Sequence, residues 1–411
     1  MNRKFFLEET DLTLDVVILL ISGLMMVLTG TLLFPVARGT VAYYENGVYG
    51  LVLFLFALQI VLLGKTPFGD MKRSTPLFIA GLAVASAGIV TCFIPGIFSR
   101  FPALLLFLCF TPGGTALLVH LFLAPDRFRV WARLGGMFHL LWIGCAVVYL
   151  LSMLMGVLVL NQGLFSGDET AAAVLVFGAA ILFLAAVLKK IYSRYPLPEE
   201  KERGRGALSA DHSVILLTGI FMVLLGFFLV PVSLGMLPFA ASAQLGLLMV
   251  IMAFKMLSTG NTPIGIFRRT RFVVICGILF AALGIVSCII PGILVPLLTV
   301  LIGVLNIFSG VMGLRGTLSR IPKRGGDPVP PILVRLNLSQ IVLNLLSIMF
   351  GASMLFPGLL PSFVTGLILA ANGGVLLYLL RILTLLEKMS GTTAESPHSE
   401  ETAGMSRSPV A

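Results

Sequence analysis

Long apolar runs alternate with short polar segments along almost the whole chain. A helix needs about 20 mostly apolar residues to cross a bilayer, and twelve runs approach or exceed that length. The pattern therefore predicts an all-α, polytopic membrane protein with about twelve transmembrane helices. The expected spans are 14–34, 47–63, 76–98, 101–124, 134–160, 171–192, 213–232, 240–258, 271–292, 294–314, 332–356 and 362–386.

The second half of the chain resembles the first at a fixed offset of 196 residues. Residues 64–97 align without a gap to residues 260–293, and 16 of these 34 positions are identical. Apolar composition alone would not align Gly, Pro and Arg in this way, which indicates a duplication. Each half is expected to hold three helical hairpins. Because six spans are an even number, the two copies are predicted to form a 6+6 tandem repeat with parallel topology.

Polar segments divide the chain into four expected units. These are a first six-helix membrane unit (1–192), a charged cytoplasmic linker (193–212), a second six-helix unit (213–389) and a disordered cytoplasmic tail (390–411). The tail is too poor in large apolar residues to fold by itself. The first apolar run is of spanning length and no small-residue cleavage site follows it, which predicts no cleavable signal peptide.

Composition and charge support this interpretation. The chain is 58% hydrophobic and 11% charged, whereas charged residues approach a quarter of a soluble domain. Of the 28 basic residues, 26 belong to one alternate set of loops, and the other set holds only Arg38 and Arg100. Because short cytoplasmic loops retain Lys and Arg, both termini are predicted to be cytoplasmic. The net charge of +10 is thus a topology signal and does not indicate a nucleic-acid partner.

Glycines recur seven residues apart, which is two helical turns, on one face of several spans. Such small residues let helices approach closely in lipid, so we expect them to be packing positions through which the halves contact each other. The predicted packing glycines are Gly23, Gly30, Gly81, Gly88, Gly219, Gly226, Gly277 and Gly284. A proline ends each of these stripes, and the outer turns are expected at Pro35, Pro95, Pro231 and Pro291.

Residues for catalysis, metal binding or cofactor binding are not evident, and the prediction is a non-enzymatic protein. All five cysteines fall in predicted spans, which is typical of small packing residues and does not suggest disulfides. No histidine has another His or a carboxylate at helical ligand spacing. Asp15 and Asp211 stand where the first and seventh spans begin, and there they can satisfy free amides of the helix start.

Ionisable residues at mid-membrane depth usually mark a transport path, and here they are almost absent. Neutral polar residues remain inside the spans. Interhelical hydrogen bonds account for them, at about 1 kcal/mol each, but a pathway for a neutral solute is the alternative. The residues expected to line such a pathway are Gln59, Asn306, Asn344 and Asn372.

Glycine-marked helices that end in an outer proline resemble those of the HdeD-like family of short-repeat membrane proteins, which is associated with acid resistance. The stretches that carry the resemblance are Ser22–Pro35, Ala80–Pro95, Thr218–Pro231 and Cys276–Pro291. The chain departs from the family pattern because it holds two such units in tandem. The resemblance implies a six-helix unit in the plasma membrane and a role in stress, and it provides no catalytic residues.

The alternative resemblance is to major facilitator transporters, which also have two parallel six-helix halves. Gly64–Arg73 and Gly260–Arg269 are similar to the basic loop of that family, but Ile266 stands where the first copy has Asp70. This alternative implies a secondary transporter of a neutral or weakly charged solute. A third hypothesis is a scaffold whose basic cytoplasmic face, including Arg268 and Arg269, binds a partner. The lipid bilayer is the only partner that the sequence identifies; a homo-oligomer, a solute and a soluble partner stay open.

Overall fold

The computed structural model is a bundle of long helices. It describes residues 8, 12–71, 74–96, 98–123, 136–161, 163–195, 210–259, 261–262, 265–266, 270–320 and 330–394. Twelve of the helices in this part of the chain are long and apolar enough to cross a membrane. The predicted fold class, an all-α polytopic membrane protein, is therefore confirmed.

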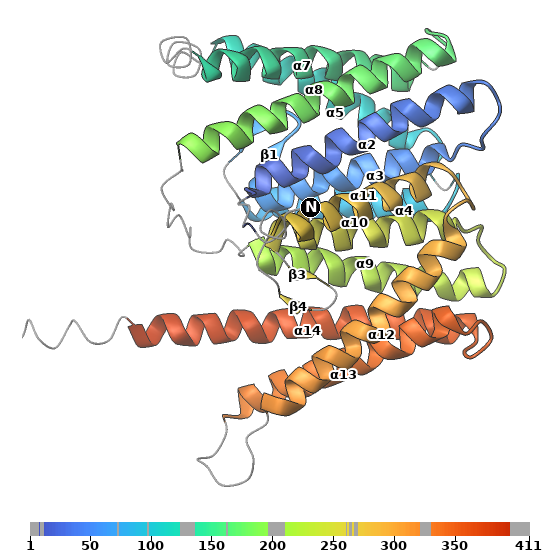
Figure 1. Cartoon of the computed structure of the whole chain (residues 1–411), viewed down its shortest axis with the longest axis vertical. Helices are drawn as coiled ribbons and strands as arrows, with labels where there is room; N and C mark the ends of the chain where they lie inside the picture. Colours follow the sequence, from blue (N-terminus) through green and yellow to red (C-terminus); the bar gives the residue numbers. More distant parts are fainter. Residues whose placement is uncertain are drawn as a thin grey trace, which may run out of the picture.

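Helices account for nearly all of the described residues, and two short strand pairs lie between them (Figure 1). In the first half the elements are α2 (Leu14–Ala37), α3 (Glu45–Leu58), η1 (Gln59–Leu63), β1 (Lys65–Thr66), β2 (Gly69–Asp70), α4 (Thr75–Phe93), α5 (Phe101–Leu123), α7 (Met137–Leu160) and α8 (Gly167–Arg194). In the second half they are α9 (Ala210–Ser233), α10 (Ala241–Thr259), β3 (Asn261–Thr262), β4 (Gly265–Ile266), α11 (Arg271–Ile289), α12 (Val295–Arg320), α13 (Pro331–Leu355) and α14 (Ser362–Ala394).

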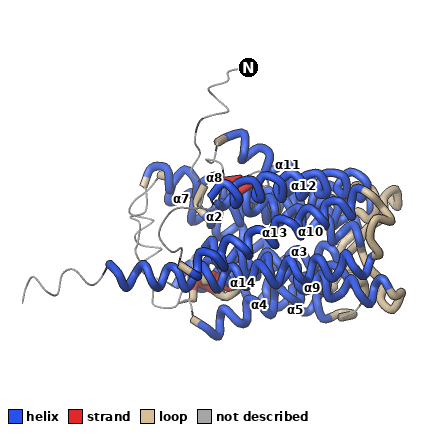
Figure 2. Tube along the Cα trace, turned by 90° about the horizontal axis from the view of Figure 1, so that it is seen from below, coloured by secondary structure: helices blue, strands red, loops and turns tan. Residues whose placement is uncertain are grey.

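Both halves use the same pairs of neighbouring helices. In the first half α2 packs on α8, α3 on α4, α5 on α7, and α7 on α8. In the second half the corresponding pairs are α9 with α14, α10 with α11, α12 with α13, and α13 with α14. In Figure 1 the α7–α8 pair forms the top of the molecule and α13 and α14 form the bottom, with α12 and α13 inclined to the other helices. Figure 2 shows the loops gathered toward the two ends of the bundle.

The halves meet along a seam, a name used here for the contact of α2, α3 and α4 with α9, α10 and α11. The helices α3 and α10 lie deepest, with 72% and 83% of their apolar segments buried. Phe93 packs edge-on against Phe221 across the seam, with ring centroids 5.8 Å apart. Phe54 and Phe254 are also fully buried. In lipid, van der Waals packing of this kind has to hold helices together, because leaving lipid for a protein interior brings no hydrophobic gain.

A glycine in the left-handed conformation ends α2 at its C-terminus. Gly39 has a φ of 69°, and its N–H donates to the carbonyl of Val36 at 2.9 Å. The N–H of Thr40 donates to the carbonyl of Pro35 at 3.0 Å, which completes a Schellman motif. Pro35 therefore lies within the last turn of α2, and the prediction that it forms the connecting turn is wrong. The helix continues for two residues past Pro35, and the left-handed Gly39, four residues after the proline, then ends it.

The helix α9 ends in the same way, so Pro231 is also a residue of the last helical turn, contrary to expectation. The N–H of Met236 donates to the carbonyl of Pro231 at 3.0 Å, and Gly235 has a φ of 72°. Pro95 and Pro291 differ, since they follow the ends of α4 and α11 and each precedes a glycine with positive φ.

The helix α8 begins at Gly167, four residues before the predicted span. Ser166 and Glu169 form a capping box, in which the N–H of Ser166 donates to Glu169 Oε2 at 2.8 Å and the N–H of Glu169 donates to Ser166 Oγ at 3.4 Å. Asp168 and Glu169 lie in the first turn of α8, where the helix dipole favours negative charge. Glu45 likewise lies in the first turn of α3.

The predicted start of the C-terminal tail differs from the end of the last helix in the structure. The helix α14 continues to Ala394, so residues 390–394 are helical although the sequence placed them in the tail. A helix that has left the membrane can continue because each added residue adds one backbone hydrogen bond. Residues 395–411 and most of the predicted linker, 196–209, lie outside the described residues.

Candidate functional site

Glycines let α3 and α4 touch through their backbones. A Cβ added to Gly50 would lie 2.5 Å from the carbonyl oxygen of Gly88, and one added to Gly88 would lie 2.8 Å from that of Gly50. Gly246 of α10 and Gly284 of α11 meet in the same way, at 2.5 Å in both directions. Since real Cβ atoms do not come this close to a carbonyl oxygen, a larger residue at these positions would push the helices apart.

The outer pairs, α2 with α8 and α9 with α14, have similar contacts. A Cβ on Gly30 would lie 2.5 Å from the backbone nitrogen of Leu175, and one on Gly226 would lie 2.5 Å from the carbonyl oxygen of Gly366. At the other predicted positions, a Cβ would lie 2.7 to 2.9 Å from a side chain of the adjacent helix: Gly23, Gly81, Gly219 and Gly277.

The eight predicted glycines thus lie between helices of the same half. The sequence led us to expect that the halves pack through these glycine faces, but the large side chains of the seam occupy that place. Gly47 of α3 is an exception that the sequence did not suggest, because a Cβ there would collide with the carbonyl oxygen of Cys288 in the other half. The sequence also missed Gly50 and Gly246 as packing positions, although they match at the 196-residue offset.

The four neutral residues proposed to line a pathway lie on four different elements. Gln59 begins the π-helix η1 at the end of α3, while Asn306, Asn344 and Asn372 lie on α12, α13 and α14. The amide of Asn306 donates to the carbonyl of Ile302 in its own helix at 2.9 Å. Asn344 packs against Gly313 of the neighbouring helix. None of the four residues is among those that line the cavity described next.

A small apolar cavity lies where α3, α9 and α10 meet in the seam. Its volume is ≈ 10 Å³, about the space that one water molecule needs. The only polar lining group is the hydroxyl of Thr218, which donates to the carbonyl of Val214 at 2.7 Å. The lining residues are Phe54, Leu58, Val214, Leu217, Thr218, Ile251 and Phe254.

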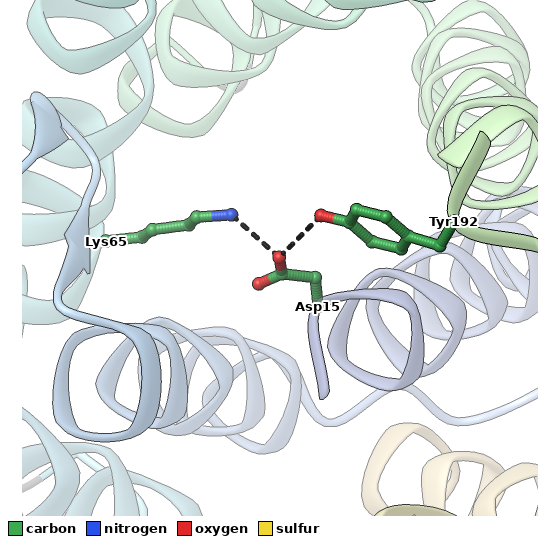
Figure 3. A network of polar contacts seen from close by, with 3 residues as sticks. All are labelled: Asp15, Lys65 and Tyr192. Atoms are coloured by element: carbon green, nitrogen blue, oxygen red, sulfur yellow. Dashed lines mark hydrogen bonds and ion pairs between the residues drawn. The ribbon is translucent and has the colours of Figure 1, made fainter. Parts of the chain in front are cut away.

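Three polar side chains form an inner cluster at the end of the first half that carries the strand pair β1–β2. Asp15 Oδ2 lies 3.1 Å from Lys65 Nζ and accepts a hydrogen bond from the Tyr192 hydroxyl at 3.1 Å (Figure 3). Asp15 thereby joins α2 to β1 and α8. It was expected to satisfy amides of the helix start; instead its carboxylate binds these two side chains.

The second half keeps the aspartate of this cluster, as Asp211, but not its two partners. At the 196-residue offset Asn261 stands in place of Lys65 and Lys388 in place of Tyr192. The strand pair nevertheless has the same register, since Lys65 faces Asp70 in β1–β2 and Asn261 faces Ile266 in β3–β4. The ion pair is therefore not required to form this hairpin. The first and sixth helices of the second half approach through another polar pair, His212 Nε2 and Glu387 Oε1, at 3.7 Å.

Cysteines and metal ligands give no further site. Cys92, Cys145 and Cys288 are buried free thiols, and Cys109 and Cys276 are half-buried. Within the described ranges, no three or more His, Cys, Asp or Glu side chains are close enough to hold a metal ion. Arg268 and Arg269, suggested for a scaffold role, lie outside the described residues.

No family model, no curated protein and no solved structure matches the chain. The HdeD-like resemblance therefore stays a prediction from the sequence. The contacts described above provide the physical basis for assigning a function.

Replacing Gly88 by leucine should reduce the amount of folded protein in membranes. A side chain there meets the backbone of α3, and overpacking of this kind costs about 1–3 kcal/mol or more. Gly374→Leu is the matched control, because a Cβ at Gly374 has no neighbour within 4 Å. Yield in membranes and the melting temperature after purification measure the effect. Equal values for the two variants would contradict the packing role of Gly88.

Replacing Lys65 by asparagine, the residue that the second half carries, should lower the melting temperature slightly at low salt. The Lys65 side chain is 43% exposed, so the pair with Asp15 contributes at most about 1 kcal/mol. The difference from the parent protein should shrink at high salt, since screening weakens exposed pairs. Lys190→Asn, on the exposed inner end of α8, changes the charge equally and is the control. If both variants melt alike at every salt concentration, the inner cluster does not stabilise the fold.

Proposed function

We propose that the chain is a non-enzymatic multi-pass protein of the plasma membrane with a role in acid resistance or a related stress. The observation that carries this proposal is the closed seam. Phe54, Phe93, Phe221 and Phe254 fill it, and its cavity has room for about one water molecule. A seam filled in this way supports a role in which the protein resides in the membrane and does not carry a solute between its halves.

The HdeD-like resemblance supports the stress role, and it rests on the glycine and proline pattern of the chain. Gly88 and Gly284, which belong to the stretches that carry the resemblance, make close backbone contact with Gly50 and Gly246 of the neighbouring helices. The resemblance assigns no catalytic residues, so the proposal names packing positions only.

Both termini are proposed to face the cytoplasm. The basic loops support this orientation, and the twelve spans require the two ends to lie on the same side. Reporter tags fused to the two ends should both be inaccessible to a probe that stays outside intact cells, and should become accessible after the cells are opened. A tag that reacts in intact cells would contradict the proposed orientation.

Deletion of the gene in its natural host should reduce survival at low pH and leave solute uptake unchanged. The experiment compares parent, deletion and complemented strains in an acid challenge and in a panel of neutral and weakly charged solutes. An uptake defect that complementation restores would favour the transporter alternative. Normal survival together with normal uptake would contradict the stress role. The Gly374→Leu variant, which should fold, is the control for complementation by a substituted chain, and it should restore survival as the parent chain does.

A further inference from the structure

Backbone hydrogen bonds join the two halves reciprocally at the outer end of the seam. The N–H of Tyr44 in the first half donates to the carbonyl of Ile289 in the second at 2.9 Å. The N–H of Ala240 in the second half donates to the carbonyl of Phe93 in the first, also at 2.9 Å. Tyr44 and Ala240 differ by 196 residues, and so do Phe93 and Ile289. Each bond is thus the counterpart of the other with the halves exchanged.

Buried thiols show the same relation. Cys92 donates to the carbonyl of Gly47 at 3.3 Å, and Cys288 donates to the carbonyl of Ala243 at 3.6 Å. Both pairs are again related by 196 residues. A Cβ added to Gly47 would also collide with the carbonyl oxygen of Cys288, so Gly47 lies against both cysteines. Counterpart residues that reach one place from opposite halves lie near a two-fold axis, so this contact marks where that axis would pass.

Helix contacts across the seam also occur in exchanged pairs. The helix α2 contacts α11, and its counterpart α9 contacts α4; likewise α3 contacts α11, and α10 contacts α4. At the α4–α9 crossing Phe93 packs on Phe221. The corresponding positions on α11 and α2 are Ile289 and Met25, both fully buried. The side chains differ in kind, but the helices that they join are equivalent.

From these relations we infer that each six-helix half carries a self-complementary binding surface, and that the chain is a fused dimer of two such units around a pseudo-two-fold axis. An isologous interface uses the same patch on both partners, so that residue i of one unit contacts residue j of the other and the reverse. In the first half the surface consists of the ends of α3 and α4 that carry Tyr44 and Phe93, together with the face of α2 that contacts the other half. In the second half it consists of the corresponding parts of α10, α11 and α9. Its partner is the other copy of the same surface. Parallel repeats place such an axis along the membrane normal.

Paired cysteines test this inference in the full-length chain. All five native cysteines are replaced by alanine, and a protease site is placed in the segment 196–209. Two double variants join the halves at the reciprocal contacts, Tyr44→Cys with Ile289→Cys and Phe93→Cys with Ala240→Cys. After oxidation in membranes and cleavage, each should remain at full length on a non-reducing gel and separate into two fragments on reduction.

Matched controls use the same four positions in the other combination. Tyr44→Cys with Phe93→Cys, and Ala240→Cys with Ile289→Cys, place both thiols in one half, so cleavage should release the fragments. If neither inter-half pair stays joined, the interface is wrong; if only one does, the halves are in contact but not related by two-fold symmetry. Should the alanine-substituted chain fail to fold, the five native cysteines are replaced by serine instead, and release of fragments from both inter-half pairs after oxidation is again the contradicting result.

Discussion

Close backbone contact between paired helices is the constraint on which this bundle depends. Lipid is as apolar as a leucine side chain, so helices gain nothing by leaving it except packing and hydrogen bonds. Packing is strongest where no side chain separates the backbones, and the crossings of Gly50 with Gly88 and of Gly246 with Gly284 achieve this. The hairpins formed in this way provide the surfaces on which the seam is built.

The seam follows a different rule from the hairpins. It is filled by large apolar side chains such as Phe93 and Phe221. Backbone hydrogen bonds join the halves near both of its ends, from Tyr44 and Ala240 at one end and from the N–H of Arg271 to the carbonyl of Glu8, at 3.1 Å, at the other. Small residues allow rigid approach within a half, whereas large ones fill the wider space between halves. The cavity where α3, α9 and α10 meet has space for about one water molecule, and the proposed function accordingly involves no passage of a solute.

The spans and the glycine positions could be predicted from the sequence because both depend on local composition and periodicity. The helix ends were less predictable, since they depend on single hydrogen bonds. The helix α2 continues past Pro35 until the turn at Gly39, and the cap at Ser166 begins α8 before the predicted span. The inner cluster could not be predicted at all. Asp15 was recognised as a helix-start residue, but its partners Lys65 and Tyr192 are far away in the sequence and meet it only in the folded chain. The prediction of a polar pathway was based on residue type alone, and the side chain of Asn306 makes its hydrogen bond within its own helix.

The distance between Gly50 and Gly88 in a lipid bilayer decides whether the paired helices are in backbone contact. Solid-state NMR of the protein labelled with ¹³C only at glycine can detect through-space correlations between their carbonyl and α carbons. The account predicts a correlation between Gly50 and Gly88, and a second between Gly246 and Gly284, each lost when one member of the pair is replaced by alanine. Spectra without either correlation would contradict backbone contact at these crossings, and with it the explanation of how the bundle holds together.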